Sequence, residues 1–401
     1  MAARTVDAGS EKMVTVVEVA LVDGTWEYRD LNFAWEPSGD TAGEPSKESA
    51  EESSDPAGSP GPPKKIAPFA SPRNGLAAVR LSRNSYRVYY VDAYGGIIEL
   101  ALDDGRVRSR NLTTALGAPV AGAMSPLAVT EPGNLAVHYF DTENRLVRLN
   151  HKDGWKWHRY DEAPAASSAS PLTAMVTADV QRVLVYFLDA RNNLVEVIWQ
   201  RDKNVLVTDL SSLIKRLPAV SPVSPLSAVG FTSDSRRIYY LDISNNPVEV
   251  AHTPGRAGQI WWSYTNLSVT SGAPVAREGS SIAVALARTS ESRVYYQNVT
   301  GDIAEVENSH PTTPGRLADS GDGAPTTTDT SALAAVISAD NVKNYVFYAH
   351  DGGRLINLEW TGGRWQSRNL STELRLPTAA HAGPMSAVFD LGPRAYYLSS
   401  E

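Results

Sequence analysis

Cysteine is absent from all 401 residues. Without thiols the chain can form neither disulfide bonds nor thiolate zinc sites, and it has no cysteine nucleophile. An excess of basic residues is absent too, because 37 Lys and Arg stand against 45 Asp and Glu and give a formal net charge of −8. Surfaces that bind nucleic-acid phosphates usually carry a basic face, so the sequence predicts no nucleic-acid partner.

Long apolar stretches are also missing. No run of 18 apolar residues occurs, and the N-terminal stretch MAARTVDAGSEK lacks the apolar segment of a signal peptide. We therefore expect no membrane span and a cytoplasmic protein, with unconventional release left open. The absence of cysteine fits such a reducing compartment.

Motifs of common catalytic sites do not occur. The seven histidines make no short metal-ligand spacing such as HExxH. The sequence has no G-x-S-x-G elbow, no phosphate loop and no GxGxxG after a strand. We therefore expect neither a metal nor a cofactor.

What the sequence does contain is a recurring stretch in which apolar and polar residues alternate around a short turn, as in a β-hairpin. Copies begin at residues 87, 136, 184, 237, 293 and 345, and they read RVYYVDAYGGIIEL, AVHYFDTENRLVRL, LVYFLDARNNLVEV, RIYYLDISNNPVEV, RVYYQNVTGDIAEV and YVFYAHDGGRLINL. Most copies have one further strand before them and one after, which gives about four strands per unit. Four short strands in ~40–50 residues are typical of a β-propeller blade.

A seventh copy is divided between the chain ends. RAYYLSS near the C-terminus and VVEVALVDGTW near the N-terminus together rebuild one hairpin. A blade shared by both ends closes the ring and leaves no exposed outer sheet at the seam. The sequence therefore predicts an all-β propeller, most simply with seven four-stranded blades of which the last is shared between the N- and C-termini; six blades are the alternative.

The predicted units have unequal composition. We expect an N-terminal tail at 1–12, the last strands of the closing blade at 13–35, six whole blades at 69–384 and the first strands of the closing blade at 385–401. Residues 36–68 contain TAGEPSKESAEESSDPAGSPGPPKK, which is rich in Pro, Ser and Glu and has no aromatic residue. Such a segment cannot bury enough apolar surface to offset its ordering entropy, so we expect a flexible insertion.

Two smaller patterns point to turns. Three N-x-[ST] sequences stand at the end of a blade's last strand, where a turn-forming role competes with glycosylation: Asn111, Asn266 and Asn369. Three aspartates follow the aromatic residues of a hairpin, where they are expected to accept hydrogen bonds in the turn rather than act as catalytic acids: Asp92, Asp189 and Asp242.

An Arg and a Glu recur at fixed places in the hairpins. Four blades carry the pair: Arg87 with Glu99, Arg237 with Glu249, Arg293 with Glu305, and Arg394 with Glu18 across the termini. Three blades have lost it and show Ala136 with Arg148, Leu184 with Glu196, and Tyr345 with Asn357. Residues equally far from a hairpin turn face each other, so Arg87 and Glu99, six residues to either side of Ala93, can converge on one face.

Such a pair supports two interpretations. Guanidinium donors beside a carboxylate acceptor suit the hydroxyls of a sugar, and an aromatic ring would suit its apolar face. A structural salt bridge is the alternative, and an exposed one contributes only about 0–1 kcal/mol. Because three blades keep the hairpin without the pair, the blade itself does not require it.

On these residues the chain resembles the fungal fucose-binding lectins of the orange-peel mushroom lectin type. The shared pattern is R-[IV]-Y-[YF], a Glu 12 residues after the Arg and then G-x-W, and it covers the chain apart from its first dozen residues and the insertion. The resemblance implies that an Arg and a Glu of one blade hold fucose and that an aromatic residue of the next blade packs on the sugar's methyl group. It also implies binding of fucosylated glycans without catalysis, and leaves a homodimer open.

The aromatic partners carry over unevenly. The next blade offers Trp155 and Trp157 to the first pair, and Trp360 and Trp365 to the pair of Arg293 and Glu305. The corresponding strands offer no ring to the other two pairs. Seven blades instead of the six of the best-known members, and three lost pairs, depart from the family. They keep a second hypothesis open, a lectin-like propeller recruited as a biosynthetic enzyme that handles an apolar small molecule in a single pocket; a plain interaction scaffold is a third.

Overall fold

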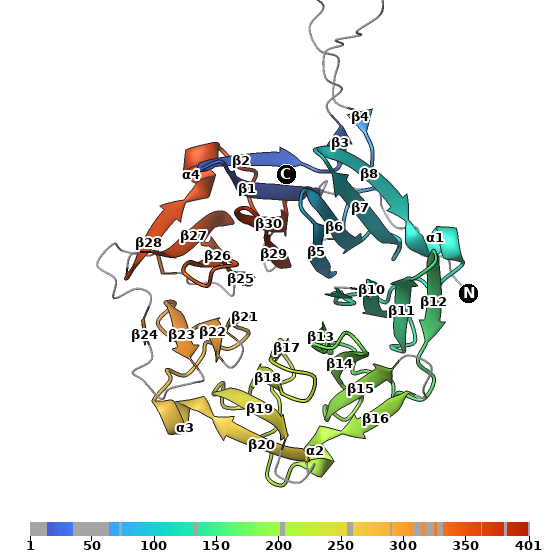
Figure 1. Cartoon of the computed structure of the whole chain (residues 1–401), viewed down its shortest axis with the longest axis vertical. Coiled ribbons are helices and arrows are strands. Elements are labelled where there is room, and N and C mark those ends of the chain that lie inside the picture. The colour runs from blue at the N-terminus through green and yellow to red at the C-terminus, as the bar shows by residue number, and fades with distance from the viewer. Residues whose placement is uncertain are drawn as a thin grey trace, which may run out of the picture.

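The computed structural model describes residues 14–34, 64–71, 74–131, 133, 135–200, 205–254, 260–288, 291–307, 315–316, 325–326, 332–361, 363–380 and 383–399. Within these residues, seven four-stranded antiparallel sheets form the blades of a closed ring (Figure 1). The seven-bladed all-β propeller expected from the repeats is confirmed, and the six-bladed alternative is wrong. The predicted tail at 1–12 lies outside the described residues.

The closing blade, here blade 7, joins the two ends of the chain. Its strands run in the order β29 (Met385–Phe389), β30 (Pro393–Leu398), β1 (Val16–Val22) and β2 (Thr25–Asp30) from the centre outward. β1 pairs antiparallel with β30, with Ala20 opposite Arg394 and Glu18 opposite Tyr396. Five residue pairs, each made of one residue from β1 and one from β30, therefore join the two ends of the chain and close the ring.

The other blades follow in chain order around the ring (Figure 1). Blade 1 consists of β5 (Leu76–Ser82), β6 (Ser85–Val91), β7 (Ile97–Asp103) and β8 (Arg106–Asn111); blade 2 of β9 (Ala128–Thr130), β10 (Ala136–Phe140), β11 (Leu146–His151) and β12 (Trp155–Arg159); blade 3 of β13 (Leu172–Val176), β14 (Arg182–Leu188), β15 (Leu194–Gln200) and β16 (Leu206–Asp209). Blade 4 consists of β17 (Ser227–Gly230), β18 (Arg236–Leu241), β19 (Pro247–Pro254) and β20 (Ile260–Asn266); blade 5 of β21 (Ile282–Arg288), β22 (Glu291–Gln297), β23 (Ile303–Glu307) and β24 (Gly315–Arg316); blade 6 of β25 (Leu333–Ile337), β26 (Asn344–His350), β27 (Arg354–Thr361) and β28 (Arg364–Asn369).

The hydrophobic core is divided among the junctions between neighbouring blades. In β6, Val88 and Tyr90 pack toward blade 7, whereas Tyr89 and Val91 pack toward blade 2. This alternation follows from the pleat of a strand, which points successive side chains to opposite faces. Each junction, named below by its two blades, is therefore built from one face of each of two sheets.

The second aromatic residue of the R-x-Y-Y pattern has a structural role. In six blades it is a tyrosine whose hydroxyl donates to a proline carbonyl of the segment that enters the blade: Tyr90 to Pro68, Tyr139 to Pro119, Tyr240 to Pro218, Tyr296 to Pro274, Tyr348 to Pro325 and Tyr397 to Pro377. Blade 3 has Phe187 there, which has no hydroxyl. A buried hydroxyl needs such a partner, so in these six blades the tyrosine anchors the blade to its entering segment.

The expected turn-forming roles are confirmed. Asn111, Asn266 and Asn369 are the N-caps of α1 (Leu112–Leu116), α3 (Leu267–Ser271) and α4 (Leu370–Leu374), where each side chain accepts from a backbone N–H of the first turn. Asp209 caps α2 (Leu210–Leu213) in the same way. The hairpin aspartates each accept from two backbone N–H groups of their turn: Asp92, Asp189 and Asp242.

The predicted insertion at 36–68 begins and ends beside the outer edge of the ring. β3 (Phe33–Ala34) pairs with β4 (Lys64–Lys65), so the chain leaves and re-enters the described part at one place (Figure 1). Residues 35–63 lie outside the described residues. Ala67 is buried in the core at the junction of blades 7 and 1.

Candidate functional site

The four Arg–Glu pairs all lie on the face of their blade that meets the next blade along the chain. In blade 1, Glu99 is directly opposite Tyr89, and Arg87 is opposite Ala101. The expectation that Arg87 and Glu99 face each other directly is wrong, because Val91 pairs with Ile97 and the hairpin is centred one residue later than Ala93. The two side chains are diagonal neighbours on one face, and blades 4, 5 and 7 have the same register.

The tyrosine opposite each glutamate completes the constellation. Its hydroxyl donates to the carboxylate at 3.0 Å from Tyr89 to Glu99, 2.6 Å from Tyr239 to Glu249, 3.0 Å from Tyr295 to Glu305 and 2.9 Å from Tyr396 to Glu18. Burial, reinforced by the neighbouring carboxylate, raises the pKa of all four tyrosines. They therefore stay protonated and keep donating. Sequence reasoning passed over them, although the first Tyr of R-x-Y-Y marked them.

The arginines approach their glutamates to different degrees. Arg293 Nη1 lies 2.7 Å from Glu305 Oε1, and Arg394 Nη1 lies 3.1 Å from Glu18 Oε1. Arg237 Nε lies 3.4 Å from Glu249 Oε1. Arg87 instead donates to Asp103 Oδ1 at 2.8 Å, and burial raises the pKa of the Glu99 carboxyl against the opposing effects of Tyr89 and Arg87. The structure thus brings three of the four pairs into contact.

Two of the junctions place an indole of the next blade on the site tyrosine. Trp155 meets Tyr89 edge to face at 6.2 Å between ring centroids, and Trp365 meets Tyr295 at 6.2 Å as well. Trp360 lies 5.6 Å from Trp365, and Trp157 keeps 41% of its surface exposed on the strand that carries Trp155. At both junctions an indole of the next blade therefore packs against the tyrosine whose hydroxyl donates to the glutamate.

A cleft opens at the junction of blades 7 and 1, which we call the seam cleft. Its volume is about 430 Å³, and its lining includes Glu18, Arg29, Tyr86, Leu102, Asp104 and Arg394. The guanidinium of Arg394 lies over the Tyr86 ring, 4.5 Å from its centroid, and Arg29 donates through Nε to the Glu18 carboxylate. The corresponding outer strands of blade 1 offer no ring to this pair, as the sequence indicated; the aromatic neighbour comes instead from β6.

One position at junction 7–1 differs from its counterparts in blades 6 and 7. Trp26 stands opposite Leu21 in blade 7, and Trp365 stands opposite Trp360 in blade 6. Val107 stands at the corresponding place of blade 1, opposite Leu102. An indole is much larger than an isopropyl group, so junction 7–1, where Val107 packs against the core, lacks a ring that blades 6 and 7 carry at this place.

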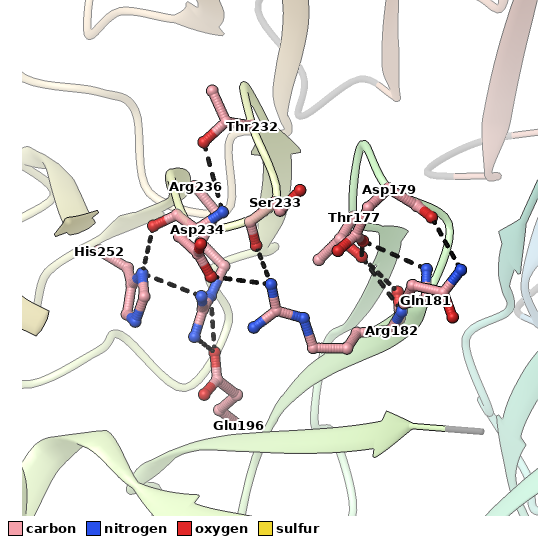
Figure 2. A network of polar contacts seen from close by, with 10 residues as sticks. All are labelled: Thr177, Asp179, Gln181, Arg182, Glu196, Thr232, Ser233, Asp234, Arg236 and His252. Atoms are coloured by element: carbon pink, nitrogen blue, oxygen red, sulfur yellow. Dashed lines mark hydrogen bonds and ion pairs between the residues drawn. The ribbon is translucent and has the colours of Figure 1, made fainter. Parts of the chain in front are cut away.

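The three blades without the pair fill their junctions with their own side chains. Glu196 of blade 3 accepts from Arg236 of blade 4 (Figure 2). It also accepts from Tyr186. Arg148 of blade 2 lies over the Trp199 ring, 3.9 Å from its centroid. Tyr345 of blade 6 stacks with Phe389, with centroids 6.1 Å apart.

Other kinds of site find little support in the described part of the chain. There, no group of three or more His, Asp or Glu residues is placed to hold a metal ion. In the same residues no helix has the length and apolar character needed to cross a membrane.

The repeated geometry agrees with a sequence family. A family model described as fungal fucose-specific lectin matches residues 128–380, more than half of the chain. The protein belongs to this fungal lectin family. Family and fold together support a carbohydrate-binding lectin with glycans as partners. A search among curated proteins by sequence finds no match.

Three solved structures show a similar fold at low sequence identity. The six-bladed fucose-binding lectin of Aleuria aurantia is 21% identical, with a TM-score of 0.50 over 74% of this chain and 95% of that chain. The BP39L lectin of Burkholderia pseudomallei is 14% identical, with a TM-score of 0.56 over 79% and 88%. AofleA of Arthrobotrys oligospora is 14% identical, with a TM-score of 0.53 over 82% and 89%. At these identities the likeness concerns the fold alone.

Proposed function

We propose that this lectin binds fucosylated glycans at the blade junctions that carry an Arg–Glu pair. The observation that carries the proposal is the repeated arrangement at junctions 1–2 and 5–6. In each, a tyrosine donates to the glutamate and an indole of the next blade packs on that tyrosine. Family membership supports the same ligand.

The chemistry of junction 5–6 fits a sugar ligand. Arg293 and Tyr295 both donate to Oε1 of Glu305, and no hydrogen bond from the described residues reaches its Oε2. A carboxylate oxygen with open lone pairs accepts from sugar hydroxyls, while the remaining guanidinium N–H groups donate to sugar oxygens. The partly buried indole of Trp360, which packs on the buried Trp365, offers an apolar surface to the methyl group.

The remaining pairs are ranked by their surroundings. Junction 7–1 combines Arg394 and Glu18 with the ring of Tyr86 beside an open cleft, and is a third proposed site. At junction 4–5, Arg237 and Glu249 have the Phe231 ring of their own blade, 5.3 Å from the guanidinium carbon, and we propose it as the weakest site. Several weak sites on one ring gain avidity toward multivalent glycans.

The enzyme alternative expects a single apolar pocket. The seam cleft has instead a charged lining, in which Arg29 and Arg394 both donate to Glu18. This favours a polar guest. The homodimer stays open, and the cytoplasmic location remains a prediction.

Titration calorimetry of the full chain with methyl α-fucoside tests the proposal. We expect binding of the fucoside, weaker or no binding of methyl galactoside and mannoside, and loss of one site per ring in Arg293→Ala. Arg368→Ala is the matched control, because Arg368 also pairs with a glutamate, at 2.9 Å, but on an exposed part of blade 6. Binding confined to the non-fucosylated sugars, or equal losses in both variants, would contradict the proposal.

A further inference from the structure

Arg236 of blade 4 makes a buried contact with the glutamate of blade 3. Its Nε and Nη2 lie 3.0 and 2.8 Å from Glu196 Oε1, which also accepts from Tyr186 at 2.9 Å. Both charged side chains are only 3% exposed. Figure 2 shows the guanidinium reaching across the junction to the carboxylate. Glu196 and Tyr186 are the counterparts of Glu305 and Tyr295, and Leu184 stands where those residues have Arg293.

Neighbouring groups hold Arg236 in this position. Its Nη1 lies 2.9 Å from His252 Nδ1, and burial together with the charge of Arg236 lowers the pKa of His252 to about 4. The ring is therefore neutral at pH 7. Trp262 places its ring 5.0 Å from the guanidinium carbon. Arg182 binds Asp234 Oδ1 at 2.8 Å at the rim of the junction (Figure 2).

The place of Arg236 in the repeat explains its reach. It immediately precedes the arginine of the R-x-Y-Y pattern, so the pleat points it toward the preceding blade. The same place holds Tyr86 in blade 1, whose ring lies under Arg394 of blade 7. In blade 5 it holds Ser292, whose hydroxyl lies 2.6 Å from that of Tyr239 in blade 4. In blade 6 it holds the buried Asn344.

We propose that junction 3–4 is a sugar site occupied by the protein itself, with the guanidinium of Arg236 on the carboxylate that would otherwise accept from sugar hydroxyls. The residue at this place then determines whether the preceding junction is open to fucose: the serine, asparagine and tyrosine above, and Leu135 of blade 2, leave it open, and an arginine closes it. This inference rests on the proposed lectin function. It assigns a specificity-determining position that the family pattern of Arg, Glu and Trp does not include.

Calorimetric stoichiometry with methyl α-fucoside tests it in both directions. The double variant Leu184→Arg with Arg236→Ser gives Glu196 a cation from its own blade, as at junction 5–6, and we expect one more site per ring than in the wild type. The variant Asn344→Arg should place a guanidinium at Glu305 and remove one site. Arg182→Ala is the control, since it breaks the rim contact to Asp234 without touching Glu196, and it should leave the number of sites unchanged.

The outcomes separate the two proposals. A wild type that binds no fucoside overturns the proposed function and this inference with it. A wild type that binds, beside a variant that melts cooperatively and keeps the wild-type number of sites, overturns this inference alone. If the double variant does not fold, Asn344→Arg decides by the same criterion.

Discussion

Replacing Arg236 by Met should cost much of the protein's stability. Methionine keeps an apolar stem beside Trp262, but it leaves the Glu196 carboxylate buried without its cation. Removing one partner of a buried ion pair costs about 3–5 kcal/mol. With an unfolding entropy of ~2.1 cal/mol/K per residue, a chain of 401 residues has at most about 0.8 kcal/mol/K, so the melting temperature should fall by roughly 4–6 °C or more.

The double variant Arg236→Met with Glu196→Gln isolates the cause of that loss. Glutamine still accepts from the Tyr186 hydroxyl but carries no charge, so most of the stability should return. Thermal and denaturant unfolding of the wild type, both single variants and the double variant give the coupling free energy. A loss below about 1 kcal/mol in Arg236→Met, or no recovery in the double variant, would refute the burial argument.

The same loss should depend on pH with a definite sign. Burial raises the pKa of the Glu196 carboxyl, and Arg236 and Tyr186 oppose the rise. In Arg236→Met the pKa of Glu196 should rise further, because the carboxylate has lost its cation. As the pH falls, Glu196 then becomes protonated in the folded protein, and the cost of burying its charge disappears. The difference in melting temperature between wild type and Arg236→Met should therefore be smaller at pH 5 than at pH 8, and a constant difference would count against the mechanism.

Two further predictions concern the seam cleft. Val107→Trp should fill it with the indole that other blades carry, so calorimetry should show one fucose site fewer and an unchanged or higher melting temperature; an unchanged number of sites would contradict the assignment. The Asp390 carboxylate accepts a hydrogen bond from Tyr86 at 2.6 Å and binds Arg80 at 2.9 Å. Burial alone would raise the pKa of Asp390, but these contacts hold that pKa below its usual value. A carboxyl group whose pKa is lowered by folding stabilises the fold at pH values above its unfolded pKa of ~3.9, and this stabilisation is lost as the pH falls. Asp390→Asn should therefore lower the free energy of unfolding by about 1–3 kcal/mol at pH 7 and by much less near pH 3. Melting curves at both pH values check this, and an equal loss at both would contradict it.

The ring of blades was predictable because its signals are local and repeated. Each copy of the hairpin pattern predicts two neighbouring strands. The two half-copies RAYYLSS and VVEVALVDGTW lie at opposite ends of the chain, so they can pair only if the blades form a closed ring. The capping role of Asn111 was equally local, because an N-cap acts within one turn of its own position.

The contents of the junctions were less predictable because they combine residues that the repeat separates by a whole blade. Comparing copies showed that Leu184 had replaced an arginine, but not that Arg236, which lies outside the aligned pair, supplies a guanidinium from the next blade. The Tyr86 ring under Arg394 was unpredictable for the same reason, because it comes from β6 of the next blade and not from an outer strand, where the family pattern has its aromatic residue.

The junction, rather than the blade, is therefore the unit in which this protein's sites should be compared. Within one strand, the motif arginine and the first tyrosine face forward, while the residue before the arginine faces back. A substitution at the backward-facing place changes the site of the preceding blade and leaves its own blade's site intact. Loss of a motif arginine thus does not by itself describe what a junction contains: at junction 3–4 the positive charge is still present, but it now comes from the opposite sheet and lies on the carboxylate.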